Sequence, residues 1–141
     1  MKKEVMLRIS GVHFPDGQDD REEMELVTAG SYFEKDGRRY IKYDEVQEDS
    51  DEVIQNLMKI EDHSLELTKR GLTNVHMVFE KDKKSESYYD TPFGKFLVGI
   101  SATHLDVREE EEELNVQVRY ALEINNAYVA DCSISIYACT K

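Results

Sequence analysis

The chain has 141 residues, of which 40% are hydrophobic and 34% charged, and this composition is typical of one globular domain spanning residues 1–141. Lys and Arg total 18 against 30 Asp and Glu, so the formal net charge is −12. That charge repels the phosphates of nucleic acids and the headgroups of anionic membranes, and we expect neither as a partner.

The N-terminus lacks the apolar stretch of a secretory signal, and no run approaches the roughly 18 apolar residues of a membrane helix. Cys132 and Cys139 fall on one expected strand, where their spacing places them about 23 Å apart and on opposite faces. An intramolecular disulfide is therefore not expected. These features together predict a cytoplasmic protein.

In chain order, apolar residues recur with a period of two, which predicts strands rather than helices. Asp36-Gly37 and Asn125-Asn126 are expected hairpin turns. The expected strands cover residues 4–10, 22–34, 39–46, 64–70, 75–79, 85–90, 95–107, 116–124 and 128–138. Residues 128, 130, 132, 134, 136 and 138 are expected to share one face of the last strand.

Residues 53–60 fit either structure, because Val53, Leu57 and Ile60 would also share one face of a helix. With or without this segment, the pattern predicts an all-β fold: an antiparallel up-and-down meander of about eight to ten strands. Such a meander usually closes into a barrel, since closure removes exposed strand edges. The interior of a barrel of this size is either packed or holds one small ligand.

Six segments, taken in order, resemble the YwiB-like proteins of Gram-positive bacteria: YIKYDE at 40–45, LTKRG at 67–71, MVF at 77–79, YDTPFG at 89–94, ISATHL at 100–105 and VQVRYAL at 116–122. The resemblance spans nearly the whole chain. It implies a calycin-type, lipocalin-like barrel in the cytoplasm, with residues 53–60 as a strand. It implies no established activity and therefore no catalytic residue. Phe93 stands where the family has a tyrosine.

Four residues form the candidate ligand site. Tyr40 and Lys42 share one strand face and, if that face points into the barrel, Tyr89 and Tyr120 lie nearby. Arg39, on the opposite face, would then lie outside. The alternative is that the tyrosines pack as core residues and direct their hydroxyls toward the barrel mouth, as buried tyrosines commonly do.

No cofactor, metal site or catalytic residue is predicted. The four histidines do not have ligand spacing on any one element, and a zinc site needs three or four convergent ligands. His104 and Asp106 would lie on one strand face, but no nucleophile motif accompanies them.

Three functions follow as hypotheses. The first is a small-molecule-binding barrel that holds an apolar or amphipathic ligand in its lumen. The second is a solidly packed barrel that acts as a protein-interaction or regulatory module. The third is an enzyme that uses Tyr40, Lys42 or His104 in the lumen.

Overall fold

The computed structural model describes residues 2–15, 22–46, 52–71, 74–91 and 94–141. These residues contain no helix, and so none that could cross a membrane. The strands are β1 Lys2–Pro15, β2 Glu22–Lys35, β3 Arg38–Val46, β4 Val53–Ile60, β5 Ser64–Arg70, β6 Val75–Glu80, β7 Lys84–Thr91, β8 Gly94–Glu109, β9 Glu113–Ile124 and β10 Ala127–Thr140. The all-β prediction is confirmed, and residues 53–60 form a strand.

All ten strands belong to one antiparallel sheet in the order β6-β5-β4-β3-β2-β1-β10-β9-β8-β7. Consecutive strands pair throughout, except β6 and β7, which form the two ends of the sheet. The barrel is therefore nearly closed, with its seam between β6 and β7. The first and last strands pair in the middle of the sheet, where Val5 lies opposite Thr140 and Ile9 opposite Ile136.

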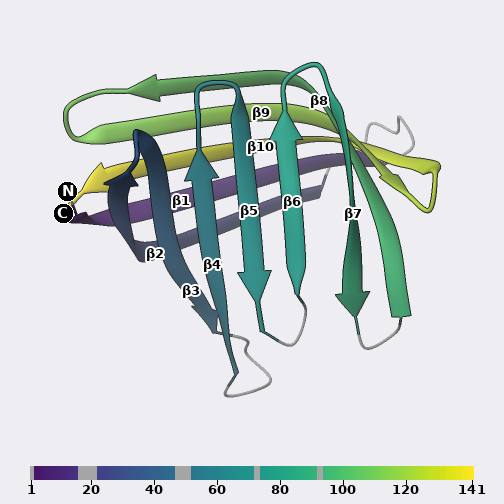
Figure 1. Ribbon diagram of the computed structural model, residues 1–141, viewed down its shortest axis with the longest axis horizontal. Helices are drawn as coiled ribbons and strands as arrows, with labels where there is room; N and C mark the ends of the chain where they lie inside the picture. The colour runs from purple at the N-terminus through teal and green to yellow at the C-terminus, as the bar shows by residue number, and fades with distance from the viewer. Residues whose placement is uncertain (1, 16–21, 47–51, 72–73, 92–93) are drawn as a thin grey trace.

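Two groups of strands cross each other to enclose the core. Figure 1 shows β3 to β7 running across the long strands β1, β9 and β10, while β2 and β8 bend to join the two groups. Away from bulges, alternate residues of the strands point inward, as a period of two requires. The most deeply buried large side chains are Leu7, Ile41, Ile60, Leu65, Phe79, Ile100, Val116, Val118 and Ile136.

The bend in β2 depends on a glycine. A Cβ at Gly30 would lie 2.9 Å from the carbonyl oxygen of Lys42, closer than a side chain tolerates. This contact marks the point where β2 crosses onto β3. Residues 31–35 of β2 pair with β3, whereas residues 22–30 pair only with β1.

Within the described ranges, two β-bulges shift the alternation of inward and outward residues. One lies between Ala102 and His104 in β8, where the carbonyl of Ala102 accepts a hydrogen bond from the Asp82 amide at 2.9 Å. The other lies between Tyr128 and Ala130 in β10. It turns Tyr128 outward, away from the buried Ala130 and Cys132, so the expectation that Tyr128 shares one face with these residues is wrong. A bulge adds one residue to a strand and therefore reverses the face.

Both expected hairpin turns are confirmed. Asp36 and Gly37 have φ values of 53° and 76°, and Asn125 and Asn126 have values of 51° and 68°. Two successive positive φ angles are the signature of the tight turn that matches the twist of a hairpin. Asn and Gly, with Asp, adopt this backbone conformation at the least cost.

Cys132 and Cys139 are not joined by a disulfide. Cys132 faces the core, whereas Cys139, on the opposite face of β10, is half-buried.

Candidate functional site

The barrel encloses a cavity of about 230 Å³ that is partly open to solvent. Its walls come from both crossing groups of strands and are largely apolar, including Met58, Leu65, Leu67, Phe79 and Ile136. The volume exceeds that of an engineered cavity of about 150 Å³ that binds benzene. The interior is therefore not solidly filled.

A small cluster of polar side chains, Tyr43, Glu45 and Lys69, forms part of the wall of this cavity. Lys69 Nζ lies 2.8 Å from Glu45 Oε1, and both side chains belong to the inner faces of their strands. Tyr43 is buried and also lines the cavity. Burial and the nearby Glu45 carboxylate raise the pKa of Tyr43, so its hydroxyl keeps its proton at neutral pH.

Asn56 lies between Tyr43 and Lys69 in the strand register, and its side chain is buried. Its Nδ2 donates to the carbonyl of Ile54 at 3.3 Å. Among the residues that the structure describes, Oδ1 of Asn56 has no hydrogen-bond partner. A buried acceptor without a partner lowers stability, and such groups are uncommon in folded proteins.

Aromatic residues form a second part of the wall. Phe79 and Tyr120 meet edge to face with ring centroids 4.9 Å apart. Burial raises the pKa of Tyr120, and its contacts with Cys132 and Tyr89 act in the same direction. Burial also raises the pKa of Tyr89 to about 12. Both phenols are therefore neutral near pH 7.

The structure separates the four predicted ligand-site residues into two pairs. Tyr120 lines the cavity and Tyr89 packs against the core, close to Tyr120. Tyr40 and Lys42 lie on the outer face of β3, because Ile41 and Tyr43 occupy the inner face. The expectation that Tyr40 and Lys42 point into the lumen is therefore wrong.

The outer face of β3 explains this error. Tyr40 stacks on Phe33 of β2 with centroids 5.0 Å apart, and Lys42 Nζ lies 5.4 Å from the centre of the Phe33 ring. Aromatic residues thus cover the outside of the sheet as well as the inside. Alternation alone cannot decide which of two partly apolar faces is the inner one.

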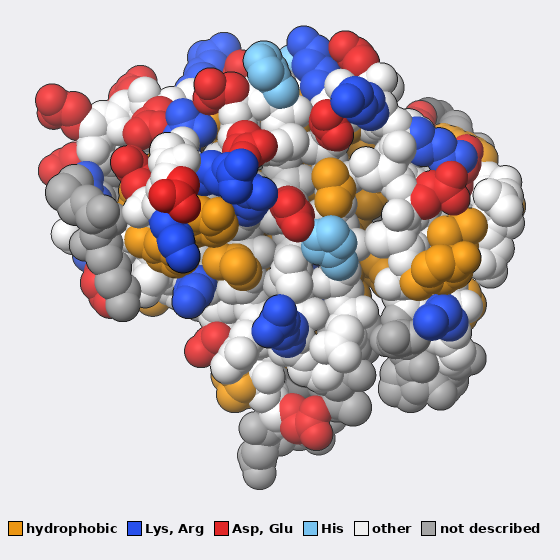
Figure 2. All heavy atoms as spheres, in the orientation of Figure 1, with side chains coloured by type: hydrophobic (Ala, Val, Ile, Leu, Met, Phe, Trp, Pro, Cys, Tyr) orange, Lys and Arg blue, Asp and Glu red, His pale blue; other side chains and the backbone are white. Residues whose placement is uncertain are grey.

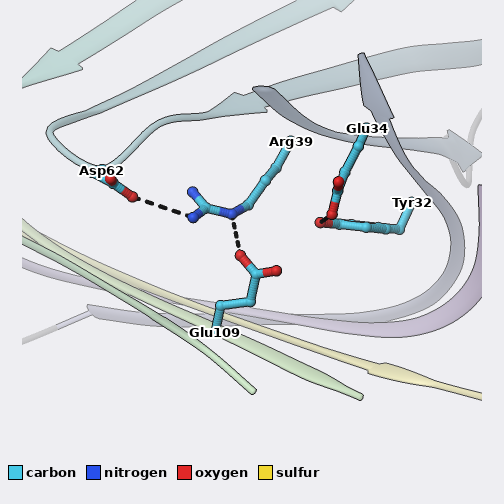
Figure 3. A network of polar contacts seen from close by, with 5 residues as sticks. All are labelled: Tyr32, Glu34, Arg39, Asp62 and Glu109. Carbon is cyan, nitrogen blue, oxygen red and sulfur yellow. Dashed lines mark hydrogen bonds and ion pairs between the residues drawn. The ribbon is translucent and has the colours of Figure 1, made fainter. Parts of the chain in front are cut away.

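Arg39 is also on the side opposite to the one expected. It points inward at the end of the barrel, where it donates to Asp62 at 3.2 Å and to Glu109 (Figure 3). Burial opposes its charge, but these two bonds raise the pKa of Arg39. Beside them, the hydroxyl of Tyr32 donates to Glu34 at 2.9 Å. This network joins β3, the turn after β4 and the end of β8.

The remaining chemical candidates lie on the surface. His104 is exposed beside the bulge of β8, and Asp106 accepts from Arg108 at 3.0 Å rather than from a histidine. Figure 2 shows acidic and basic side chains interspersed over the visible face, with apolar atoms in small separate patches. Among the described residues, no three His, Cys, Asp or Glu side chains converge as metal ligands. Phe93 lies outside the described residues.

The sequence interpretation missed Glu45, Lys69 and Asn56. A signal for the first two was present. Glu45 continues the inward series Ile41 and Tyr43, and Lys69 continues the series Leu65 and Leu67. A charged residue two positions beyond the last apolar residue of the inner face lies on that same face, near the end of the strand.

Fold and cavity together define a protein class: antiparallel β-barrels with a nearly closed sheet and a partly open interior. The chain belongs to the family described as Domain of unknown function (DUF1934), whose model matches residues 7–136. Among solved structures it is similar to the crystal structure of ywiB protein from Bacillus subtilis.

That similarity extends over 99% of this chain and 93% of the other, with a TM-score of 0.81 and 17% sequence identity. The resemblance predicted from the six sequence segments is thus confirmed. At this identity the neighbour supports the fold alone. No curated protein matches the chain.

Proposed function

We propose that this protein binds a small apolar or amphipathic molecule in the lumen of its barrel. The observation that carries the proposal is the partly open cavity of about 230 Å³ with apolar walls and few polar groups. Ligand sites commonly combine these two features. The volume favours an occupant smaller than most drugs, such as one aromatic ring with a short tail.

The test is to fill the cavity. Leu67→Phe places a larger side chain on the inner face of β5, whereas Leu57→Phe adds the same atoms on the outer face of the neighbouring strand. Titration with small aromatic probes should show affinity lowered at least about tenfold by Leu67→Phe and unchanged by Leu57→Phe. Equal affinities in both variants would place binding outside the lumen and refute the proposal.

Native mass spectrometry of protein purified gently from its own source would identify the natural ligand class. A reproducible extra mass that disappears on denaturation supports the proposal. We propose a cytoplasmic location for this function, because Cys132 and Cys139 are not joined by a disulfide.

A second candidate, a protein-interaction or regulatory module, is favoured by a different observation. Residues 22–30 of β2 pair with β1 on one edge, and no described strand pairs with the other edge. An open edge can receive an extended segment of a partner. Val27 does not line the cavity, and Val27→Pro removes a backbone N–H donor from this strand. The substitution should weaken binding of a partner segment at this edge and leave binding of small molecules unchanged, so it separates the two candidates.

A further inference from the structure

The ion pair between Glu45 and Lys69 is unusual in its position. Both residues face the lumen, and their side chains are only 27% and 29% exposed. The other residues lining the cavity are mainly apolar. Removing one member of such a pair would leave a partly desolvated charge without its partner, which is costly in a protein interior.

The charges around the cavity are balanced. Glu45 and Lys69 neutralise each other at 2.8 Å. Glu25, the other charged residue of the lining, lies 3.8 Å from Arg8 and is mostly exposed. A ligand with a net charge would upset this balance, because its charge would face one partner of like sign at close range.

We propose that the Glu45–Lys69 pair selects uncharged ligands: an apolar body with one small group that both donates and accepts hydrogen bonds, such as a hydroxyl. This inference rests on the proposed lumen function and specifies its ligand class. An ammonium group has three donors and a carboxylate about four acceptor sites, so the pair retains capacity for one further group. A hydroxyl can accept from Lys69 and donate to Glu45 at once.

The experiment uses three probes that share a phenyl ring and differ in their head group: 2-phenylethanol, 2-phenylethylamine and phenylacetate. Calorimetric titration at neutral pH should show that wild type binds the alcohol at least about fivefold more tightly than either charged probe. Lys69→Gln leaves Glu45 unpaired, so the amine should become the preferred probe. Glu45→Gln leaves Lys69 unpaired, so phenylacetate should become the preferred probe.

Two further variants control for structural effects. The double substitution of Glu45 and Lys69 by Gln restores neutrality, and the alcohol should again bind best even if a single variant folds poorly. Lys59 and Glu66 form an outer-face pair at 3.8 Å between the same two strands, β4 and β5, that hold Asn56 and Lys69. Neutralising Lys59 or Glu66 should leave the order of the probes unchanged.

The outcomes distinguish the two proposals. Binding of all three probes in an order that Glu45→Gln and Lys69→Gln do not change would overturn the selectivity inference but leave lumen binding intact. A charged probe preferred by wild type would do the same. Failure of every probe to bind wild type and variants would overturn both.

Discussion

Replacing Phe79 by alanine tests the packing of the cavity wall directly. Phe79 is fully buried, borders the cavity and meets Tyr120 edge to face. Truncating a buried Phe to Ala costs about 3–5 kcal/mol, and the lost aromatic pair adds about 0.5–1.5 kcal/mol. We therefore expect a loss of about 3.5–6.5 kcal/mol, a large part of the roughly 5–15 kcal/mol that stabilises a typical domain.

The assay is urea unfolding followed by far-UV circular dichroism, since the chain contains no tryptophan. The matched control is Phe33→Ala, which removes the stacked partner of Tyr40 on the outer face. It should cost about 1–1.5 kcal/mol. Benzene should bind the enlarged cavity of Phe79→Ala and raise its unfolding midpoint. A loss below about 2 kcal/mol, or an equal loss in the control, would refute this account of the interior.

Three further predictions concern polar groups. Asn56→Leu removes the buried acceptor and should raise the free energy of unfolding by about 1 kcal/mol; a loss above about 2 kcal/mol would mean that the amide is needed. Burial raises the pKa of Tyr89 to about 12 from about 10 in the unfolded chain, so the folded state holds this proton more tightly. The stability that this protonated hydroxyl contributes is complete below pH 10 and is lost between about pH 10 and 12. In this range Tyr89→Phe should make the decline of the free energy of unfolding less steep, by up to about 1.4 kcal/mol per pH unit. An identical decline in the variant would contradict this. Arg39→Gln should lower stability by about 1–2 kcal/mol, and less at high salt, whereas Lys83→Gln, at an exposed pair, should change it by about 0.5 kcal/mol or less. Equal effects of these two substitutions in urea unfolding would argue against the network in Figure 3.

The sequence was sufficient for the strands and for their order. Alternation at a period of two marks each strand, and the paired turn residues at 36–37 and 125–126 mark two hairpins. The order of the strands in a meander then follows from their order in the sequence, because neighbours in the chain become neighbours in the sheet. The resemblance to a family settled residues 53–60, where periodicity gave no decision.

The inner faces were harder to predict. In β3, Tyr40 and Tyr43 are both aromatic, so alternation gives two acceptable phases, and the correct one depends on which residues of β2 and β4 lie opposite. Bulges introduce a second ambiguity, since each reverses the phase beyond it, as Tyr128 illustrates. The Glu45–Lys69 contact was also not predicted. It joins β3 and β5, which both pair with β4, so the contact depends on two strand registers that the sequence does not reveal.

The pairing of the first and last strands has a consequence for how the chain reaches its native state. β1 is the earliest of the described strands along the chain, yet one of its two partners, β10, is the latest. The centre of the sheet therefore cannot form while the ribosome is still producing the strands between them. Contacts so distant in sequence slow folding and leave an incomplete edge exposed in the meantime. Until β10 is available, the unpaired edge of β1 is therefore a site at which growing chains can aggregate.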